Sequence, residues 1–155
     1  MRVIALIRPD EWNLPLLMHV LGGMLLVGAL MGAATALLSG WRRDARPYTR
    51  FAFWMLLAVA LPAWLLMRVG AEWIYSKEGF GEDDEPAWLA VGYVTAEPGL
   101  LLLLISILLT AIGMRRLRNA DPERSSALTR IAAVLALVLL AAYLVAVWAM
   151  TAKPV

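Results

Sequence analysis

Four ionisable side chains interrupt the long apolar stretches of this sequence, and their types could support chemistry. They are His19, Arg68, Glu72 and Glu97. Counted along a helix from the arginine-rich ends of these stretches, His19 lies roughly 28 Å away, and Arg68 and Glu97 roughly 26 Å away. A bilayer core is about 30 Å thick. We therefore expect three different helices to place these groups in one layer near the far edge of the membrane.

Two interpretations of this layer stay open. In the structural one, Arg68 pairs with Glu72 at (i, i+4) spacing or extends to the lipid headgroups, and Glu97 is an exposed acid near a helix start. In the functional one, the layer is a polar pocket that opens outward between the helices and takes a ligand or a proton. Trp64 lies one turn before Arg68, so a cation–π contact between them is feasible.

His19 is the only histidine, and its helical face carries Gly22 and Gly23. These small residues leave room for a flat group, so a haem with His19 as axial ligand is one hypothesis, with a methionine as sixth ligand. The methionines that could serve are Met18, Met24 and Met67. The alternative is an imidazole that is hydrogen-bonded between helices, since a ring facing lipid would leave its nitrogens unsatisfied. We predict no cofactor, with haem left open.

Other catalytic and metal-binding patterns are missing from the sequence. The chain has no cysteine, which excludes disulfides and thiolate metal sites. The acidic run 82–85 lacks the alternating pattern of a calcium loop. No Ser/His/Asp set, metal-ligand cluster or phosphate loop is present. We therefore expect no catalytic residue and no metal site. The sequence favours a non-enzymatic role but leaves enzymatic activity undecided.

The elements that must position the ionisable layer are four apolar runs, at residues 14–38, 51–75, 98–114 and 128–150. The chain is 62% hydrophobic with a mean hydropathy of +0.73, and a helix needs about 20 apolar residues to cross a bilayer. The sequence predicts one all-α domain over residues 1–155, a bundle of four transmembrane helices. Pro62 predicts a kink in the second helix. Residues 88–96 are either an interfacial segment or the start of the third helix.

The basic residues predict the orientation of this bundle. Nine arginines follow the first and third runs: Arg42, Arg43, Arg46, Arg50, Arg115, Arg116, Arg118, Arg124 and Arg130. Basic residues in short loops stay cytoplasmic. We therefore expect a multi-pass protein of the bacterial inner (plasma) membrane, with both termini outside. These arginines flank the spans, so we expect no nucleic-acid partner.

The first helix carries a small-residue motif, Gly28-x-x-x-Gly32, on the side opposite His19. Such spacing allows helices to approach closely. With Gly22 and Gly23 on the other side, it predicts that this helix is contacted on two faces. The contacts come either from two helices of the bundle, or from one helix and another subunit. Besides the lipid bilayer, a homo-oligomer or a larger membrane complex is therefore an expected partner.

Several short segments resemble a family of small bacterial integral membrane proteins known as domain of unknown function 2269. The segments are 17–22, 62–64, 68, 70–74, 76–79 and 96–99. They include all four ionisable residues of the predicted layer. The resemblance covers most of the chain, and it implies four membrane helices but no particular activity.

Three functions follow from these observations. The first is a non-enzymatic packing or accessory protein with an outward-facing polar pocket. The second is a haem-binding electron carrier or assembly factor that uses His19. The third is a small proton-coupled transporter that uses Arg68, Glu72 and Glu97. Transporters usually carry ionisable residues near the midplane, whereas here the midplane holds apolar residues and Pro62.

Overall fold

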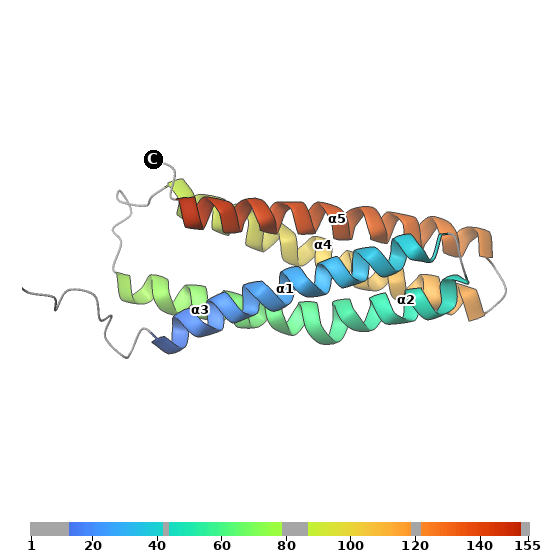
Figure 1. Ribbon diagram of the computed structural model, residues 1–155, viewed down its shortest axis with the longest axis horizontal. Coiled ribbons are helices and arrows are strands. Elements are labelled where there is room, and N and C mark those ends of the chain that lie inside the picture. Colours follow the sequence, from blue (N-terminus) through green and yellow to red (C-terminus); the bar gives the residue numbers. More distant parts are fainter. Residues whose placement is uncertain (1–12, 42–43, 79–86, 119–121, 153–155) are drawn as a thin grey trace, which may run out of the picture.

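The structure of the protein is a computed structural model that describes residues 13–41, 44–78, 87–118 and 122–152. Its elements are α1 (Asn13–Ser39), α2 (Ala45–Trp54), the π-helix η2 (Met55–Ala60), α3 (Leu61–Glu78), α4 (Ala87–Arg118) and α5 (Pro122–Ala152). Because α2, η2 and α3 follow one another without a break, the chain forms a bundle of four long helices (Figure 1). All four are long and apolar enough to cross a membrane. The predicted all-α four-helix membrane fold is thus confirmed.

The helices extend beyond the apolar runs from which they were predicted. The third helix begins at Ala87, so residues 88–96 belong to it rather than to a separate interfacial segment. The second begins at Ala45, where the side chain of Asp44 accepts a hydrogen bond of 3.2 Å from the Arg46 N–H. Apolarity marks only the part of a helix that lies in hydrocarbon. The polar helix ends depend on caps such as Asp44, which satisfy otherwise unpaired N–H groups.

Just before Pro62, where the sequence predicts a kink, the helix contains a π-helical segment. The Leu61 N–H donates to the Leu56 carbonyl, five residues earlier instead of four. Proline has no N–H, and its ring crowds the carbonyl four residues earlier in an α-helix. The wider π turn keeps this part of the helix hydrogen-bonded while the chain continues into α3.

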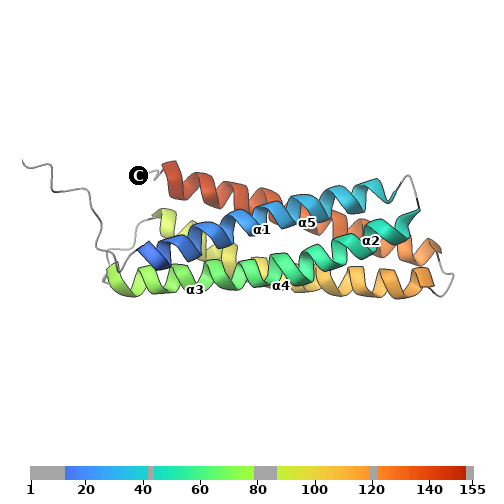
Figure 2. The same cartoon turned by 60° about the horizontal axis from the view of Figure 1, so that its bottom comes forward.

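The four helices associate as two pairs, α1 with α3 and α4 with α5 (Figures 1 and 2). We call the end of the bundle where α1 and α4 begin and α3 and α5 end the His19 end. The opposite end is the arginine end. Toward the arginine end α1 crosses to α5 and joins the pairs, whereas toward the His19 end the pairs separate (Figure 1).

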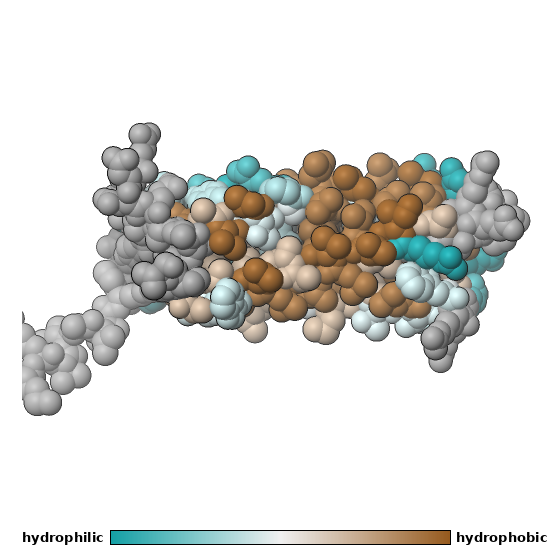
Figure 3. All heavy atoms as spheres, turned by 90° about the horizontal axis from the view of Figure 1, so that it is seen from above, coloured by the Kyte–Doolittle hydropathy of each residue, from teal (hydrophilic) through white to brown (hydrophobic). Residues whose placement is uncertain are grey.

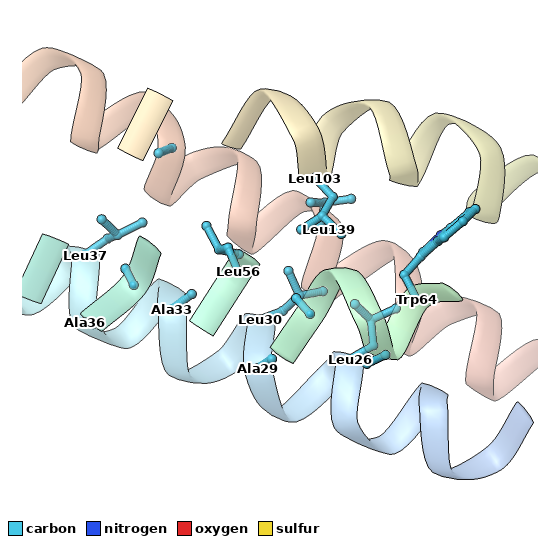
Figure 4. Close-up of a cluster of buried hydrophobic side chains, with 14 of the residues drawn as sticks. Leu26, Ala29, Leu30, Ala33, Ala36, Leu37, Leu56, Trp64, Leu103 and Leu139 are labelled. Carbon is cyan, nitrogen blue, oxygen red and sulfur yellow. The ribbon is translucent and has the colours of Figure 1, made fainter. Parts of the chain in front are cut away.

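Leucine side chains fill the middle of the bundle (Figure 4). Leu26, Leu30, Leu56, Leu103 and Leu139 are each at most 1% exposed. Alanines lie between them and let the helices come close. The outer surface is apolar as well, and Figure 3 shows a broad hydrophobic belt with hydrophilic residues toward the two ends. A helix bundle that is apolar both inside and outside is suited to a bilayer.

Candidate functional site

The closest approach of α1 and α3 lies beside His19. A Cβ on Gly70 would be 2.5 Å from the His19 backbone N, and one on Gly22 would overlap the backbone N of Met67. By contrast, a Cβ on Gly28 would meet nothing within 4 Å, while one on Gly32 would touch only the tip of Met55. The tight contact of the first helix therefore uses Gly22 and not the Gly28-x-x-x-Gly32 motif.

This close approach lets His19 hydrogen-bond to the neighbouring helix. Its Nδ1 lies 3.1 Å from the carbonyl oxygen of Met67. A carbonyl can only accept, so Nδ1 must carry the proton and Nε2 must hold a lone pair when the ring is neutral. The bond fixes both the tautomer and the orientation of the imidazole.

A cavity of about 570 Å³ lies between the two helix pairs at the His19 end. It is lined by α1, α3, α4 and α5, and its polar lining residues are His19, Arg68, Tyr93, Thr95, Tyr143 and Thr151. Most of the remaining wall is aliphatic, and it also includes Met24, Met67 and Met150. The cavity is therefore apolar with a few polar groups, which differs from the polar pocket expected from the sequence.

Arg68 bridges the two helix pairs at this cavity. Its Nη1 lies 2.7 Å from Oε1 of Glu72 on its own helix, and its Nη2 lies 3.6 Å from Oε1 of Glu97 on α4. The guanidinium also stacks over the ring of Tyr93, 4.5 Å from its centroid. The structure thus brings three members of the predicted ionisable layer together. It adds Tyr93, which was not singled out from the sequence although it lies four residues before Glu97 and therefore on the same face of α4.

Trp64 does not make the cation–π contact with Arg68 that was considered from the sequence, and instead forms a hydrogen bond to α4. Trp64 is 7% exposed, and Arg68 stacks on Tyr93 instead. The indole reaches from α3 toward α4 (Figure 4), where its N–H donates to the carbonyl of Ala96 at 3.2 Å. Ala96 directly precedes Glu97, so this bond helps to set the height of α4 relative to Arg68.

Tyr143 closes the cavity from the α5 side. Its side chain packs on Gly99 of α4, where an added Cβ would lie 2.5 Å from the hydroxyl. Among the described residues, this hydroxyl is the buried side-chain polar atom without a hydrogen-bond partner. The Trp64 indole is close by, but its N–H bonds to Ala96. Neither Tyr143 nor Gly99 stood out in the sequence, because each falls within an ordinary apolar run.

The arginine end is built differently. There the guanidinium of Arg46 donates to the Leu117 carbonyl at 3.0 Å. This bond satisfies one of the last carbonyls of α4, which have no partner within the helix. Arg130 lies over the ring of Trp41, 5.8 Å from its centroid. A second, more open groove of about 760 Å³ runs along α1 and α2 past Gly28 and Phe51. These contacts hold the helices together. They do not bring side chains together in an arrangement typical of a catalytic site.

Comparison with known proteins gives no relative. The chain matches no family model, no curated protein and no solved structure. In the part of the chain that the structure describes, no group of three His, Asp or Glu side chains could hold a metal ion.

Proposed function

We propose that the protein is a non-enzymatic membrane protein that holds an amphiphilic molecule between its two helix pairs. The cavity at the His19 end carries this proposal. Its volume of about 570 Å³ lies within the range of roughly 300–1,000 Å³ typical of small-molecule sites. Such sites are mainly apolar, with a few polar groups that orient the ligand.

The walls indicate the character of the ligand. Aliphatic side chains such as Val27, Leu89 and Leu144 favour an apolar body. The polar group of the ligand would lie toward Arg68 and Tyr93, because the guanidinium and the phenol are polar groups of the cavity lining that lie close together. An amphiphile that enters from the lipid could keep this orientation throughout.

The charges beside the cavity also matter for ligand choice. Arg68 is flanked by two carboxylates, with the Glu72 and Glu97 side chains 49% and 71% exposed. One basic side chain thus lies between two acidic ones. An anionic ligand group would therefore have to take the place of Glu97 on Arg68, which is feasible because Glu97 is largely exposed.

The middle of the bundle argues for binding rather than transport. Leu26, Leu30, Leu103 and Leu139 pack there with at most 1% exposure. Ser106 and Thr110 in the same region donate to carbonyls of their own helix. The cavity is thus separated from the arginine end by close packing, and a carrier would have to open that packing in every cycle.

The proposed orientation of this site in the membrane rests on the arginines that gather at the opposite end of the bundle. We propose that the His19 end faces outward from the plasma membrane of a bacterium, with both termini outside. Membership of the domain of unknown function 2269 family is part of the same proposal. A second copy of the chain along the groove at Gly28 and Phe51 is the proposed homo-oligomeric contact.

Filling the cavity tests the proposal. Ala146 lines the cavity and is 6% exposed, whereas Ala141 lies exposed on the same helix. Native mass spectrometry of wild type released from lipid nanodiscs should show one amphiphile retained per chain. Ala146→Phe should lose it and Ala141→Phe should keep it. Equal retention in both variants, or none in wild type, would rule out the proposed function.

A further inference from the structure

His19 lines the cavity described above, and its hydrogen bond to Met67 restricts the ligand further. Because Nδ1 carries the proton shared with the Met67 carbonyl, the atom of the ring that is left for a ligand is Nε2. We propose that Nε2 is the axial ligand of a haem bound in the cavity, an inference that rests on the amphiphile-binding function.

The hydrogen bond at Nδ1 is the arrangement that metal-bound histidines require. Such residues almost always donate their other ring N–H to a carbonyl or carboxylate, which fixes the ring and makes the coordinating nitrogen more basic. In ligation, the Nε2 lone pair forms a bond to iron, while the proton stays on Nδ1 and is still donated to the Met67 carbonyl. No proton or electron has to leave the site.

A single histidine suffices for this ligand because the porphyrin itself supplies four nitrogens to the iron. One further axial ligand is available from the three methionines that line the cavity, Met24, Met67 and Met150. Met150 extends from α5 toward α4, where its terminal methyl lies 2.5 Å from the position of a Cβ on Gly92. A histidine–methionine pair is an established haem ligation and raises the reduction potential.

The shape of the cavity suits a flat ring. Gly23, Gly28 and Gly92 all line it, so three positions on its walls have no side chain. Residues from all four long helices surround the space. A porphyrin would therefore bridge the two helix pairs where they separate, and its apolar faces would contact aliphatic walls.

The propionates of the haem would lie toward Arg68. Here they compete with Glu97, whose carboxylate is 3.6 Å from the guanidinium. Glu97→Gln should therefore tighten the binding of haem, because it removes a negative charge from the place that a propionate takes. The same change should weaken the binding of a cationic ligand. Whether Glu97→Gln raises or lowers the affinity therefore distinguishes a haem from a cationic ligand.

Titration of the purified protein in nanodiscs with hemin, and separately with metal-free protoporphyrin IX, tests the inference. Wild type should give a sharp Soret band with hemin and, after reduction, the split visible bands of six-coordinate iron. His19→Ala should lose these bands and regain them with added imidazole, which shows that the variant is folded. Protoporphyrin IX has no iron, so its binding should survive His19→Ala and be lost in Ala146→Phe.

Each other outcome has a definite meaning. Identical hemin spectra for wild type and His19→Ala would overturn ligation by His19. Failure of both porphyrins to bind, while Ala146→Phe still displaces another amphiphile, would overturn the haem and leave the proposed function standing. If no porphyrin binds and Ala146→Phe displaces nothing, both proposals fail.

Discussion

Arg68 on α3 and Glu97 on α4 face each other across the two helix pairs, with 3.6 Å between Nη2 and Oε1. The contact lies at the His19 end, where Arg68 lines the cavity. Arg68 also holds Glu72 at 2.7 Å and stacks on Tyr93. One guanidinium thus joins α3 to α4 at two points beside the cavity.

This network predicts unequal effects of its members on stability. Arg68→Leu removes three contacts and leaves two carboxylates near each other, so it should lower the melting temperature more than Glu97→Gln does. Glu97 is 71% exposed, and exposed ion pairs contribute only about 0–1 kcal/mol. A double-mutant cycle in detergent should therefore give an Arg68–Glu97 coupling below about 1 kcal/mol. A coupling of several kcal/mol would mean that the pair is shielded from water.

Glycine contacts on α1 give a second prediction. Gly22→Ala places a methyl group onto the Met67 backbone, which cannot move without separating α1 from α3. Overpacking of this kind costs about 1–3 kcal/mol. Gly28→Ala is the matched control on the same helix, since nothing lies within 4 Å of its Cβ position. It should be neutral, or stabilising by up to about 1 kcal/mol through helix propensity. Equal melting temperatures for the two variants would contradict the close approach at Gly22.

The sequence predicted the four helices well because hydrocarbon thickness and apolar run length are directly related. It also selected His19, Arg68 and Glu97, since ionisable residues are rare in such runs and their depth can be counted. It could not predict that Arg68 stacks on Tyr93 rather than on Trp64. That choice depends on how α3 is rotated relative to α4. Pro62 predicts a distortion of the helix, but it does not predict that the distortion is a π-helix at Met55–Ala60, which changes this rotation.

The sequence also could not predict that the cavity is mainly apolar. Its walls are formed by residues such as Leu144 and Val147, which look like any other lipid-facing positions. Their role depends on the separation of the two helix pairs. This separation is a property of the assembled bundle, where Tyr143 packs on Gly99 while α1 stays close to α3.

The π-helix gives a third prediction, because it contains one residue more per turn than an α-helix. Deletion of Ala58 should convert it to an α-helix and keep Arg68 in register, but Pro62 would then crowd a carbonyl at a cost of about 3 kcal/mol. Adding Pro62→Ala should restore the melting temperature. Deletion of Leu65 in α3 is the control, and it should rotate Arg68 by roughly 100° away from its partners. Equal behaviour of both deletions would show that the π segment does not set the register.

Orientation in the membrane is the subject of a fourth prediction. The chain has no cysteine, so a single cysteine reports one position. Ala45→Cys at the arginine end should resist an impermeant maleimide in intact cells and react after permeabilisation. Ser76→Cys at the His19 end should react in both cases, because positively charged loops stay inside. Labelling of Ala45→Cys in intact cells would reverse the orientation.

Tyr143 provides the last prediction, which separates packing from hydrogen bonding. Its hydroxyl is buried and has no hydrogen-bond partner among the described residues, and leaving a buried polar group unpaired costs about 1–3 kcal/mol. Tyr143→Phe keeps the ring against Gly99 and removes that group, so the melting temperature in detergent should stay equal or rise. Tyr143→Ala should lower it, because a ring is lost from the α4–α5 contact.

The order of the three melting temperatures should be the same in detergent and in lipid nanodiscs, because the hydroxyl has no partner among the described residues to lose in either. Thermal unfolding of wild type, Tyr143→Phe and Tyr143→Ala under both conditions measures this order. A clear loss of stability in Tyr143→Phe under both conditions would mean that the hydroxyl has a partner, and the nearby Trp64 indole would be the first candidate. Trp64→Phe should then cause the same loss, and the two changes together should cost no more than either alone.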